Sequence, residues 1–329
     1  MAGVTTETVD ENDDGIRLDR WMRERYPGLQ FGRLQKLLRS GQVRVDGARV
    51  KTNTRLAAGQ AVRLPPLDAE KAAAVAPTTG GSADEAVLRA FLLHEDDKVL
   101  VFNKPAGLAV QGGSGLSRHV DGMLEALRDR KGQKPRLVHR LDRETSGVLV
   151  VARTRAAAQA LAESFRARST RKIYWALTKG VPRESQGRIS TWLTKESGPD
   201  GDFMQVHRDR TADAVHAVTS YSVIDQAGQN VAWQSLRPIT GRTHQLRVHM
   251  AHLGTPIVGD PKYFNIMNWE LPGGMQNRMH LHARRIVVPH PSGGTLDVTA
   301  PMPQHMVQTW NLLGFDNDAA HDTEDGEGA

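Results

Sequence analysis

Residues 139 to 147, HRLDRETSG, place one carboxylate among arginines and a histidine. Arg140 and Arg143 lie close to Asp142 on either side, and nearby positive charge favours the ionised form of a carboxylic acid. The apolar run VLVV follows at once and indicates a buried strand, so Asp142 lies at the edge of a core. An ionised carboxylate in a dry pocket serves as a nucleophile or as a base. A salt-bridged turn is the alternative, and this segment by itself does not decide between the two.

Motifs for metal, nucleotide or serine-nucleophile chemistry are incomplete in this chain. Among 13 histidines, two pairs have the spacing of a shared helix or strand face, His249 with His252 and His280 with His282. Neither pair brings a carboxylate at a ligand spacing, and the chain has no HExxH motif and no cysteine. The glycine-rich segment 107–117 lacks the GxxxxGK[ST] pattern, and no GxSxG motif is present. We therefore expect no bound metal and no cofactor.

The overall composition is that of a globular protein. Of 329 residues, 39% are hydrophobic and 24% are charged. No apolar run approaches the roughly 18 residues of a membrane-spanning helix, and residues 1–14 lack the basic and apolar regions of a signal peptide. The lack of cysteine excludes disulfides and thiol catalysis. We expect a cytoplasmic monomer with no membrane partner.

Charge is distributed unevenly along the chain. Residues 1–14 carry five acidic residues and residues 315–329 carry six, and neither segment contains Lys or Arg. Without those acids, 26 acidic residues stand against 43 basic ones, so the net charge of +6 hides a middle region near +17. Such a charge favours a polyanionic partner, nucleic acid before an anionic membrane. Acidic ends of this composition are typical of disordered segments.

Residues 16–65 form a small basic unit, with 12 Lys or Arg against three Asp or Glu. Apolar residues at helical spacing predict two short helices, one around Leu18 and one around Leu34. Gly41 is a typical stop for the second helix. The sequence VRVDGARV (43–50) predicts a hairpin, because Asp-Gly tolerates the positive φ angles of a tight turn.

This order of elements resembles the S4 domain, a small RNA-binding module. In that family the second helix and the turn after it face RNA. The resemblance therefore implies RNA contacts by Arg33, Lys36, Arg39 and Arg44. Ordinary solvated charges on a small domain are the alternative interpretation.

The rest of the chain divides by composition into a linker, a large domain and a tail. Residues 66–85, rich in Ala, Pro, Gly and Ser, indicate a flexible linker. Residues 86–314 interleave strand and helix patterns, with strands expected over 98–105 and 171–180 and helices over 156–168 and 243–254. This mixture predicts an α+β domain rather than a doubly wound one. Residues 1–15 and 315–329 are the expected disordered acidic ends.

Four separated segments decide between the interpretations of Asp142. NKPAGL (103–108), HRLDRETSGVLVVA (139–152), KIYWA (172–176) and TGRTHQLRVH (240–249) resemble the motifs of the RluA-type pseudouridine synthases, in the order of that family. One such match is weak evidence, whereas four in register behind an S4-like unit are specific. The resemblance extends from residue 16 to about residue 313.

The resemblance implies roles for individual residues. In that family the aspartate of HRLD is catalytic, the tyrosine of KxYxA lies against the target uracil, and the arginine of LR pairs with the aspartate. These positions are Asp142, Tyr174 and Arg247. Arg140 corresponds to the arginine that enters the RNA when the base is extruded. Further substrate- or RNA-binding residues are expected to be His139, Arg242, His244 and Lys104, the last with a mainly architectural part.

The family also implies a fold and a reaction. The fold is that of the pseudouridine synthases, a mixed and largely antiparallel central sheet flanked by helices and loops. The reaction is the isomerisation of uridine to pseudouridine in RNA, without metal or cofactor. Whether Asp142 attacks the base, attacks the ribose or removes a ribose proton is left open. Within residues 262–279, the segment after GDPKYF does not align with the family pattern.

Two segments, 41–66 and 108–117, look most like the C-type branch of the family, which acts on 23S rRNA of the large ribosomal subunit. We therefore expect 23S rRNA, free or in a ribosome-assembly intermediate, as the partner. Three alternative hypotheses remain. In the first, the chain carries out the same reaction on a D-type rRNA target or on tRNA. In the second it is a non-catalytic S4-type RNA-binding protein, and in the third it is a nucleosidase in which Asp142 activates water.

Overall fold

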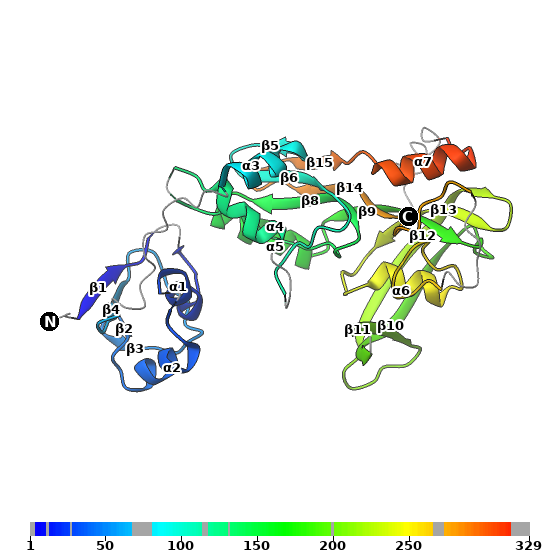
Figure 1. The fold of residues 1–329 in the computed structure, drawn as a ribbon. Coiled ribbons are helices and arrows are strands. Elements are labelled where there is room, and N and C mark those ends of the chain that lie inside the picture. Colours follow the sequence, from blue (N-terminus) through cyan, green and yellow to red (C-terminus); the bar gives the residue numbers. More distant parts are fainter. Residues whose placement is uncertain are drawn as a thin grey trace. The chain divides into compact units, whose positions relative to one another are not determined.

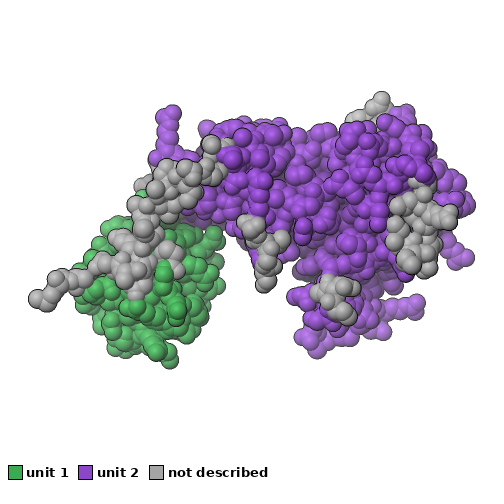
Figure 2. Space-filling model, viewed as in Figure 1, with its two compact units in different colours: residues 1–81 green, residues 82–329 purple. Residues whose placement is uncertain are grey.

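The structure, a computed structural model, describes residues 4–10, 13–26, 28–67, 81–113, 118–130, 132–198, 201–265 and 273–316. The chain forms two compact units, Met1–Gly81 and Ser82–Ala329 (Figure 2). No helix in these ranges is both long enough and apolar enough to cross a membrane. Most of the expected linker, part of the segment that does not align and most of the acidic tail lie outside the described residues, at 68–80, 266–272 and 317–329.

The smaller unit combines two helices with a four-stranded antiparallel sheet (Figure 1). Its elements are β1 (Thr5–Thr8), α1 (Leu18–Arg25), α2 (Phe31–Arg39), β2 (Arg44–Val45), β3 (Ala48–Arg49) and β4 (Ala61–Leu64), in the sheet order β1-β4-β2-β3. The expected hairpin is present, with Asp46 and Gly47 both at positive φ. Apolar side chains of both helices and of the sheet, among them Trp21, Leu34 and Val62, share one core.

The N-terminal residues differ from the disordered segment expected over 1–15. Strand β1 pairs with β4, and Val9 after it is buried. Arg25 of α1 forms ion pairs with two of the acidic residues, at 3.4 Å from its Nε to Glu7 Oε2 and 2.8 Å from its Nη2 to Asp13 Oδ2. These acids are therefore counter-charges of the basic unit. Composition alone does not reveal such a pairing, because the partners come from a later helix.

The larger unit is built on one 11-stranded sheet with the order β11-β10-β12-β13-β9-β14-β8-β6-β5, to which β15 adds beside β14 and β7 beside β8. The strands are β5 (Leu92–Glu95), β6 (Val99–Lys104), β7 (Arg136–Leu137), β8 (Ser146–Ala152), β9 (Arg171–Lys179), β10 (Gln186–Gly198), β11 (Gly201–His207), β12 (Val215–Ala227), β13 (Val231–Pro238), β14 (Leu281–Pro289) and β15 (Thr295–Thr299). Among the described pairings, only that of β14 with β8 is parallel. The expected mixed, largely antiparallel fold is confirmed.

Helices and alternating strand residues form the core of this unit. The helices are α3 (Gly81–Ala90), α4 (Val120–Met123), the 3-10 turn η2 (Leu124–Leu127), α5 (Arg155–Arg166), α6 (Gln245–His252) and α7 (Gln304–Leu313). Along β6, Leu100 and Phe102 join one apolar cluster, whereas Val99 and Val101 join the cluster on the other face, because successive strand residues point to opposite sides. The expected linker over 66–85 overlaps α3, which begins at Gly81.

Candidate active site

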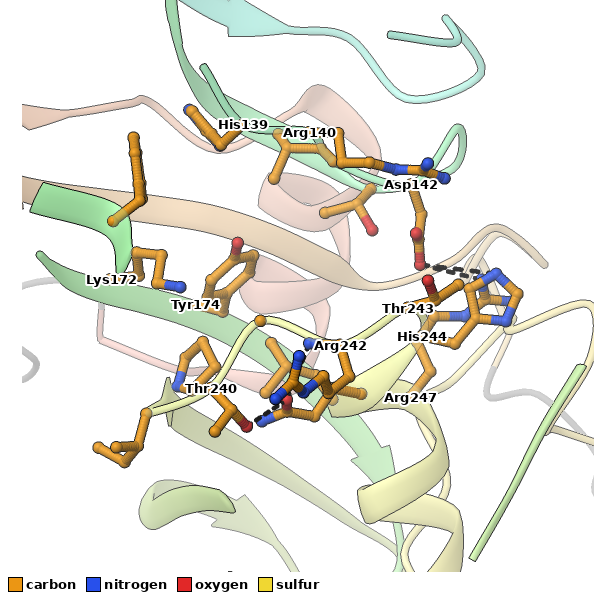
Figure 3. Close-up of a pocket in the computed structure, with 18 of the residues that line it drawn as sticks. His139, Arg140, Asp142, Lys172, Tyr174, Thr240, Arg242, Thr243, His244 and Arg247 are labelled. Atoms are coloured by element: carbon orange, nitrogen blue, oxygen red, sulfur yellow. Dashed lines mark hydrogen bonds and ion pairs between the residues drawn. The ribbon is translucent and has the colours of Figure 1, made fainter. Parts of the chain in front are cut away.

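A cavity of about 640 Å³ opens in the larger unit, within the size range of ligand sites (Figure 3). Its walls are the turn before β8, the end of α5, the start of β9, the loop after β13 and the start of α6. The described cationic lining residues are Arg140, Arg166, Arg168, Lys172, Arg242 and Arg247, and Asp142 is the one carboxylate among the lining residues. Such an excess of positive charge suits an anionic ligand.

The turn that carries Asp142 is set by its backbone and by a close approach of two strands. The Thr145 N–H donates to the Asp142 carbonyl at 3.2 Å. Gly147 follows with a φ of 109°, and a Cβ on it would clash with the Ala283 carbonyl of β14. Glycine therefore allows β8 to start directly beside β14, which places the Asp142 turn at the cavity wall.

Lys104 holds the same turn from inside the protein. It is fully buried, and its Nζ donates to the carbonyls of Arg143, Pro105 and Leu108 at 3.0, 2.8 and 2.8 Å. Burial lowers the pKa of the Lys104 ammonium to about 7, against the raising effect of two nearby carboxylates. The expected substrate contact by Lys104 is therefore corrected: the ammonium is enclosed and acts on the turn, in agreement with the architectural part of the expectation.

The neighbours of Asp142 in the sequence are not its ion-pair partners in the structure. The Arg143 Nε donates to the Gly107 carbonyl at 3.1 Å, and Arg140 is exposed at the edge of the cavity. Instead, Arg247 Nη1 donates to Asp142 Oδ2 at 3.1 Å from a position 105 residues later. The cation that bonds to Asp142 is thus Arg247 of α6, which the tertiary structure brings close to the turn.

Arg247 bridges two carboxylates. Besides its bond to Asp142, its Nε and Nη2 donate to Oδ2 and Oδ1 of Asp260, each at 2.7 Å. The Arg247 and Asp260 side chains are 4% and 0% exposed, whereas that of Asp142 is 20% exposed. Arg247 thus contacts Asp142, as the resemblance implies, but its two-armed fork is directed at another carboxylate. The fork holds Asp260, and a single bond reaches the more accessible Asp142.

Electrostatics favour a permanently charged Arg247. Burial by itself lowers the pKa of the guanidinium, but the hydrogen bonds and charge of Asp260, and then those of Asp142, outweigh burial and hold the pKa above its usual value. Arg247 is thus a fixed cation in contact with both Asp260 and Asp142.

Asp260 is a site residue that the sequence analysis missed. It follows Gly259, which has a positive φ and a position where a Cβ would clash with a backbone carbonyl. Oδ1 of Asp260 also accepts from the N–H groups of Lys262 and Tyr263, at 2.8 and 3.2 Å. The segment GDPKYF contains the residue, but nothing local marks an aspartate whose partner, Arg247, lies on a different element.

Tyr174 projects from β9 into the middle of the cavity, between Lys172 and Asp142 in the view of Figure 3. Burial raises the pKa of its phenol, and the charge of Asp142 raises it further. The phenol is therefore neutral at physiological pH and presents an aromatic face. Arg140 lines the same cavity and is exposed.

His244 lies close to Asp142 without a hydrogen bond to it. It precedes α6 with a φ of 51°, its Nδ1 is 3.1 Å from the Tyr263 hydroxyl, and its Nε2 is 3.9 Å from Asp142 Oδ2. Burial lowers the pKa of this imidazole, although the charge of Asp142 opposes the shift. His244 is thus a neutral neighbour of the carboxylate near pH 7.

The loop after β13 presents Arg242 at the cavity. Arg242 is exposed, and its Nε donates to the His216 carbonyl at 3.1 Å. The buried Gln245 shapes the loop, since its Oε1 accepts from the Thr240 hydroxyl at 2.6 Å and from the Arg242 N–H at 3.0 Å. Arg242 therefore remains placed for the RNA contact expected of it.

His139 is part of the wall. Its Nε2 accepts from the Val150 N–H at 2.8 Å, and its ring lies 4.9 Å from that of Phe165 between centroids. Burial, and secondarily the charge of Lys172, lowers the pKa of His139 to about 3. The expected substrate contact is therefore corrected to a packing role for a neutral ring whose Nε2 is occupied.

Three of the four histidines considered as metal ligands have other hydrogen-bond partners. His249 bonds with Thr191 and Thr219, His280 with Thr309 and a backbone carbonyl, and His282 with Ser146 and a backbone carbonyl. Over the described residues, no three His, Asp or Glu side chains group in a way that would hold a metal ion.

The smaller unit presents some of its expected RNA-binding residues on one helix. Arg33, Lys36 and Arg39 lie on α2 at helical spacing, and all three are exposed. Arg44 differs, because its Nε and Nη1 donate to the carbonyls of Gly41 and Gly47 at 3.1 and 3.0 Å. Its guanidinium stabilises the hairpin, which corrects the expectation that Arg44 contacts RNA.

Comparisons with known proteins show which family the chain resembles. Residues 98–252 match the family described as RNA pseudouridylate synthase. The ribosomal large subunit pseudouridine synthase C of Vibrio parahaemolyticus is 36% identical over 302 residues, 89% of this chain and 91% of that protein. A mitochondrial RNA pseudouridine synthase 4 of Arabidopsis thaliana is 34% identical and covers 89% of this chain and 78% of its own. Among solved structures, the human RNA pseudouridylate synthase domain-containing protein 4 is similar, with a TM-score of 0.60, 32% identity, and 71% of this chain and 97% of that chain covered.

Proposed function

The chain belongs to the RluA-type family of RNA pseudouridine synthases, and we propose that it converts uridines of 23S rRNA in the large ribosomal subunit to pseudouridine. Support for this target comes from relatives named for the large ribosomal subunit, which align with about nine-tenths of both chains. The observation that carries the chemical assignment is the bond from the buried Arg247 to the accessible Asp142, at the wall of a cavity that also holds Tyr174.

The proposed reaction is an isomerisation that needs no cofactor, so residues of the cavity must supply its chemistry. The N1–C1′ bond of uridine breaks, the base turns, and a C5–C1′ bond forms; one proton leaves C5 and one arrives at N1. We assign Asp142 as the catalytic carboxylate, because it is the one carboxylate among the described lining residues and Arg247 keeps it in place. An ionised carboxylate can attack the base, attack the ribose or remove a ribose proton, and the assignment of Asp142 holds for each of these roles.

Access to the base requires its removal from the RNA stack, which costs a few kcal/mol. Tyr174 offers a neutral aromatic face inside the cavity, and the exposed Arg140 offers a cation at its edge. We propose that the uracil lies against Tyr174 while Arg140 occupies the space that the base has left. Both contacts offset the cost of extrusion.

The smaller unit is proposed to be an S4-like RNA-binding domain. Its two helices, its hairpin and the exposed cationic residues of α2 support this proposal. Binding through phosphates would provide affinity without selecting the target, which leaves the choice of uridine to the RNA structure around the cavity.

Mapping of pseudouridine in rRNA and tRNA, from cells with and without the gene, tests the target. We expect pseudouridines of 23S rRNA to disappear with the gene and to return with the wild-type chain, but not with an Asp142→Asn chain. Losses confined to tRNA or to 16S rRNA would refute the 23S assignment. Release of free uracil from RNA by the purified protein would instead indicate hydrolysis.

A further inference from the structure

Lys172 is a cation in the cavity that the mechanism above does not use. It lies on β9 two residues before Tyr174, so both side chains project from the same face of the strand, about 6.6 Å apart along it. Figure 3 shows the Lys172 ammonium beside Tyr174, on the side away from Asp142. Its Nζ would be 3.7 Å from a Cβ on Gly241, which places the ammonium next to the loop that carries Arg242.

This ammonium has no partner within the part of the chain that the structure describes. No hydrogen bond or ion pair joins Lys172 to another described residue, and the carboxylate of the cavity, Asp142, is already bonded to Arg247. Burial lowers the pKa of Lys172. A partly buried cation without a counter-charge is unfavourable by itself, and such groups gain stability when an anion binds.

The surroundings of Lys172 point to a phosphate as that anion. Arg166 at the end of α5, Arg168 shortly after it and Arg242 in the loop after β13 are exposed residues of the same cavity lining. The cavity that contains the ammonium therefore has three further cationic residues that are exposed to solvent. A uracil carbonyl would offer Lys172 only a neutral acceptor, whereas a phosphate of the same nucleotide offers a charge.

We propose that Lys172 binds a backbone phosphate adjacent to the target uridine, so that the cavity recognises the RNA backbone at the reacting nucleotide as well as its base. This inference rests on the pseudouridine synthase activity and not on the choice of 23S rRNA. Lys172 is then a substrate-binding residue that fixes the position of the extruded nucleotide against Tyr174.

The test combines one protein change with one RNA change. Short RNAs that contain a uridine modified by the enzyme are made with either the 5′ or the 3′ phosphate of that uridine replaced by an uncharged methylphosphonate. Turnover is measured for wild type, Lys172→Met, Lys172→Arg and, as the control, Lys195→Met, which changes a lysine that is 66% exposed and does not line the cavity.

In wild type we expect one of the two uncharged linkages to lower kcat/KM about 10- to 100-fold, the effect of one charge-assisted contact. In Lys172→Met the natural RNA should lose a similar factor, mainly through KM, and the same linkage should have no further effect. Lys172→Arg should retain the sensitivity, and Lys195→Met should behave as wild type. Equal losses in wild type and Lys172→Met, or tolerance of both linkages by wild type, would overturn the proposal.

Melting curves give a second, independent readout. Because Met removes a cation without a partner, Lys172→Met should melt at or above the wild-type Tm. A large fall in Tm would mean that Lys172 serves the fold, and it would overturn the proposal. A fall in kcat with unchanged KM and unchanged sensitivity to the linkage would place Lys172 on the base and would overturn it as well.

Discussion

Arg247 bonds to both Asp260 and Asp142, so its contribution to the stability of the fold can be measured apart from its contribution to catalysis. Replacing Arg247 by Met leaves two carboxylates without their cation. Most of the resulting loss of stability should come from Asp260, because its side chain is fully buried. Replacing Asp260 by Asn in addition removes that buried charge. The double variant Arg247→Met/Asp260→Asn therefore lacks the same contact to Asp142 as the single variant, without an unpaired charge in the core.

The structure sets the expected magnitudes. Two charge-assisted bonds of 2.7 Å join Arg247 to Asp260 in a region closed to water, and loss of one partner of such a pair costs about 3–5 kcal/mol. The bond to Asp142 is single, longer at 3.1 Å and partly exposed, so its loss should cost the fold less than about 1.5 kcal/mol. In the reaction, loss of one hydrogen bond to a charged group removes about 1.5–3 kcal/mol of transition-state stabilisation, and at about 1.4 kcal/mol for each factor of ten kcat should fall about 10- to 100-fold.

Urea unfolding and tritium release from RNA containing 5-tritiated uridine measure the two effects separately. Arg247→Met is expected to lose about 3–5 kcal/mol of unfolding free energy, and the double variant to recover most of that loss. Both should show the same reduced kcat, because neither has the cation beside Asp142. Asp260→Asn alone serves as the control, since it retains the Arg247 bond to Asp142 and should keep the higher activity of the three.

Two results would refute this reasoning. Equal stability of Arg247→Met and the double variant would mean that Asp260 does not depend on Arg247. Recovery of activity together with stability in the double variant would mean that Arg247 contributes to the fold alone, and that its contact with Asp142 is incidental.

Further predictions follow from individual residues. Asp142→Asn should abolish tritium release while RNA affinity stays within about twofold, because only the reacting charge is lost; clear turnover by this variant would remove Asp142 from the mechanism. Lys36→Gln with Arg39→Gln should reduce the slope of log affinity against log salt by about two for rRNA and leave kcat on a short RNA unchanged; an unaltered slope would take α2 out of the RNA interface. Burial lowers the pKa of His282 from 6.5 to about 4, so the folded state resists protonation and stability should fall as the pH drops from 6.5 to 4, by up to about 3 kcal/mol; His282→Gln should show a shallower fall in urea titrations, and an equal fall would contradict the assignment. Burial also lowers the pKa of Lys104 to about 7, below its unfolded value of 10.5, so the folded state loses the cost of this charge as the pH rises from 7 to 9.5. Relative to Lys104→Met, wild type should gain stability over that range, and a difference independent of pH would refute the lowered pKa.

Much of the larger unit was predictable because its signals are local. The apolar run VLVV predicted the buried strand that the structure has as β8, and helical periodicity predicted α5 and α6 within a few residues of their observed ends. The Asp-Gly pair predicted the hairpin of the smaller unit, since only a few residue types tolerate its φ angles. The N-terminal strand β1 was missed, because its pairing with β4 joins segments more than 50 residues apart.

In the candidate site too, some features follow from local sequence and others only from the tertiary structure. The sequence by itself determined which residue types are available at the cavity, because four motifs in register point to Asp142, Tyr174 and Arg247, and it determined the basic charge that suits RNA. Only the tertiary structure decided what each charged group does. Arg143 lies next to Asp142 in sequence but turns away, whereas Arg247 arrives from α6 and is itself anchored by Asp260. Lys104 and Lys172 are the same residue type, yet three carbonyls enclose one and the other faces the cavity without a partner among the described residues. The physical reason is that burial and ion pairing depend on distances through space, which the register of the sheet and the packing of α6 set and which the order of residues along the chain does not.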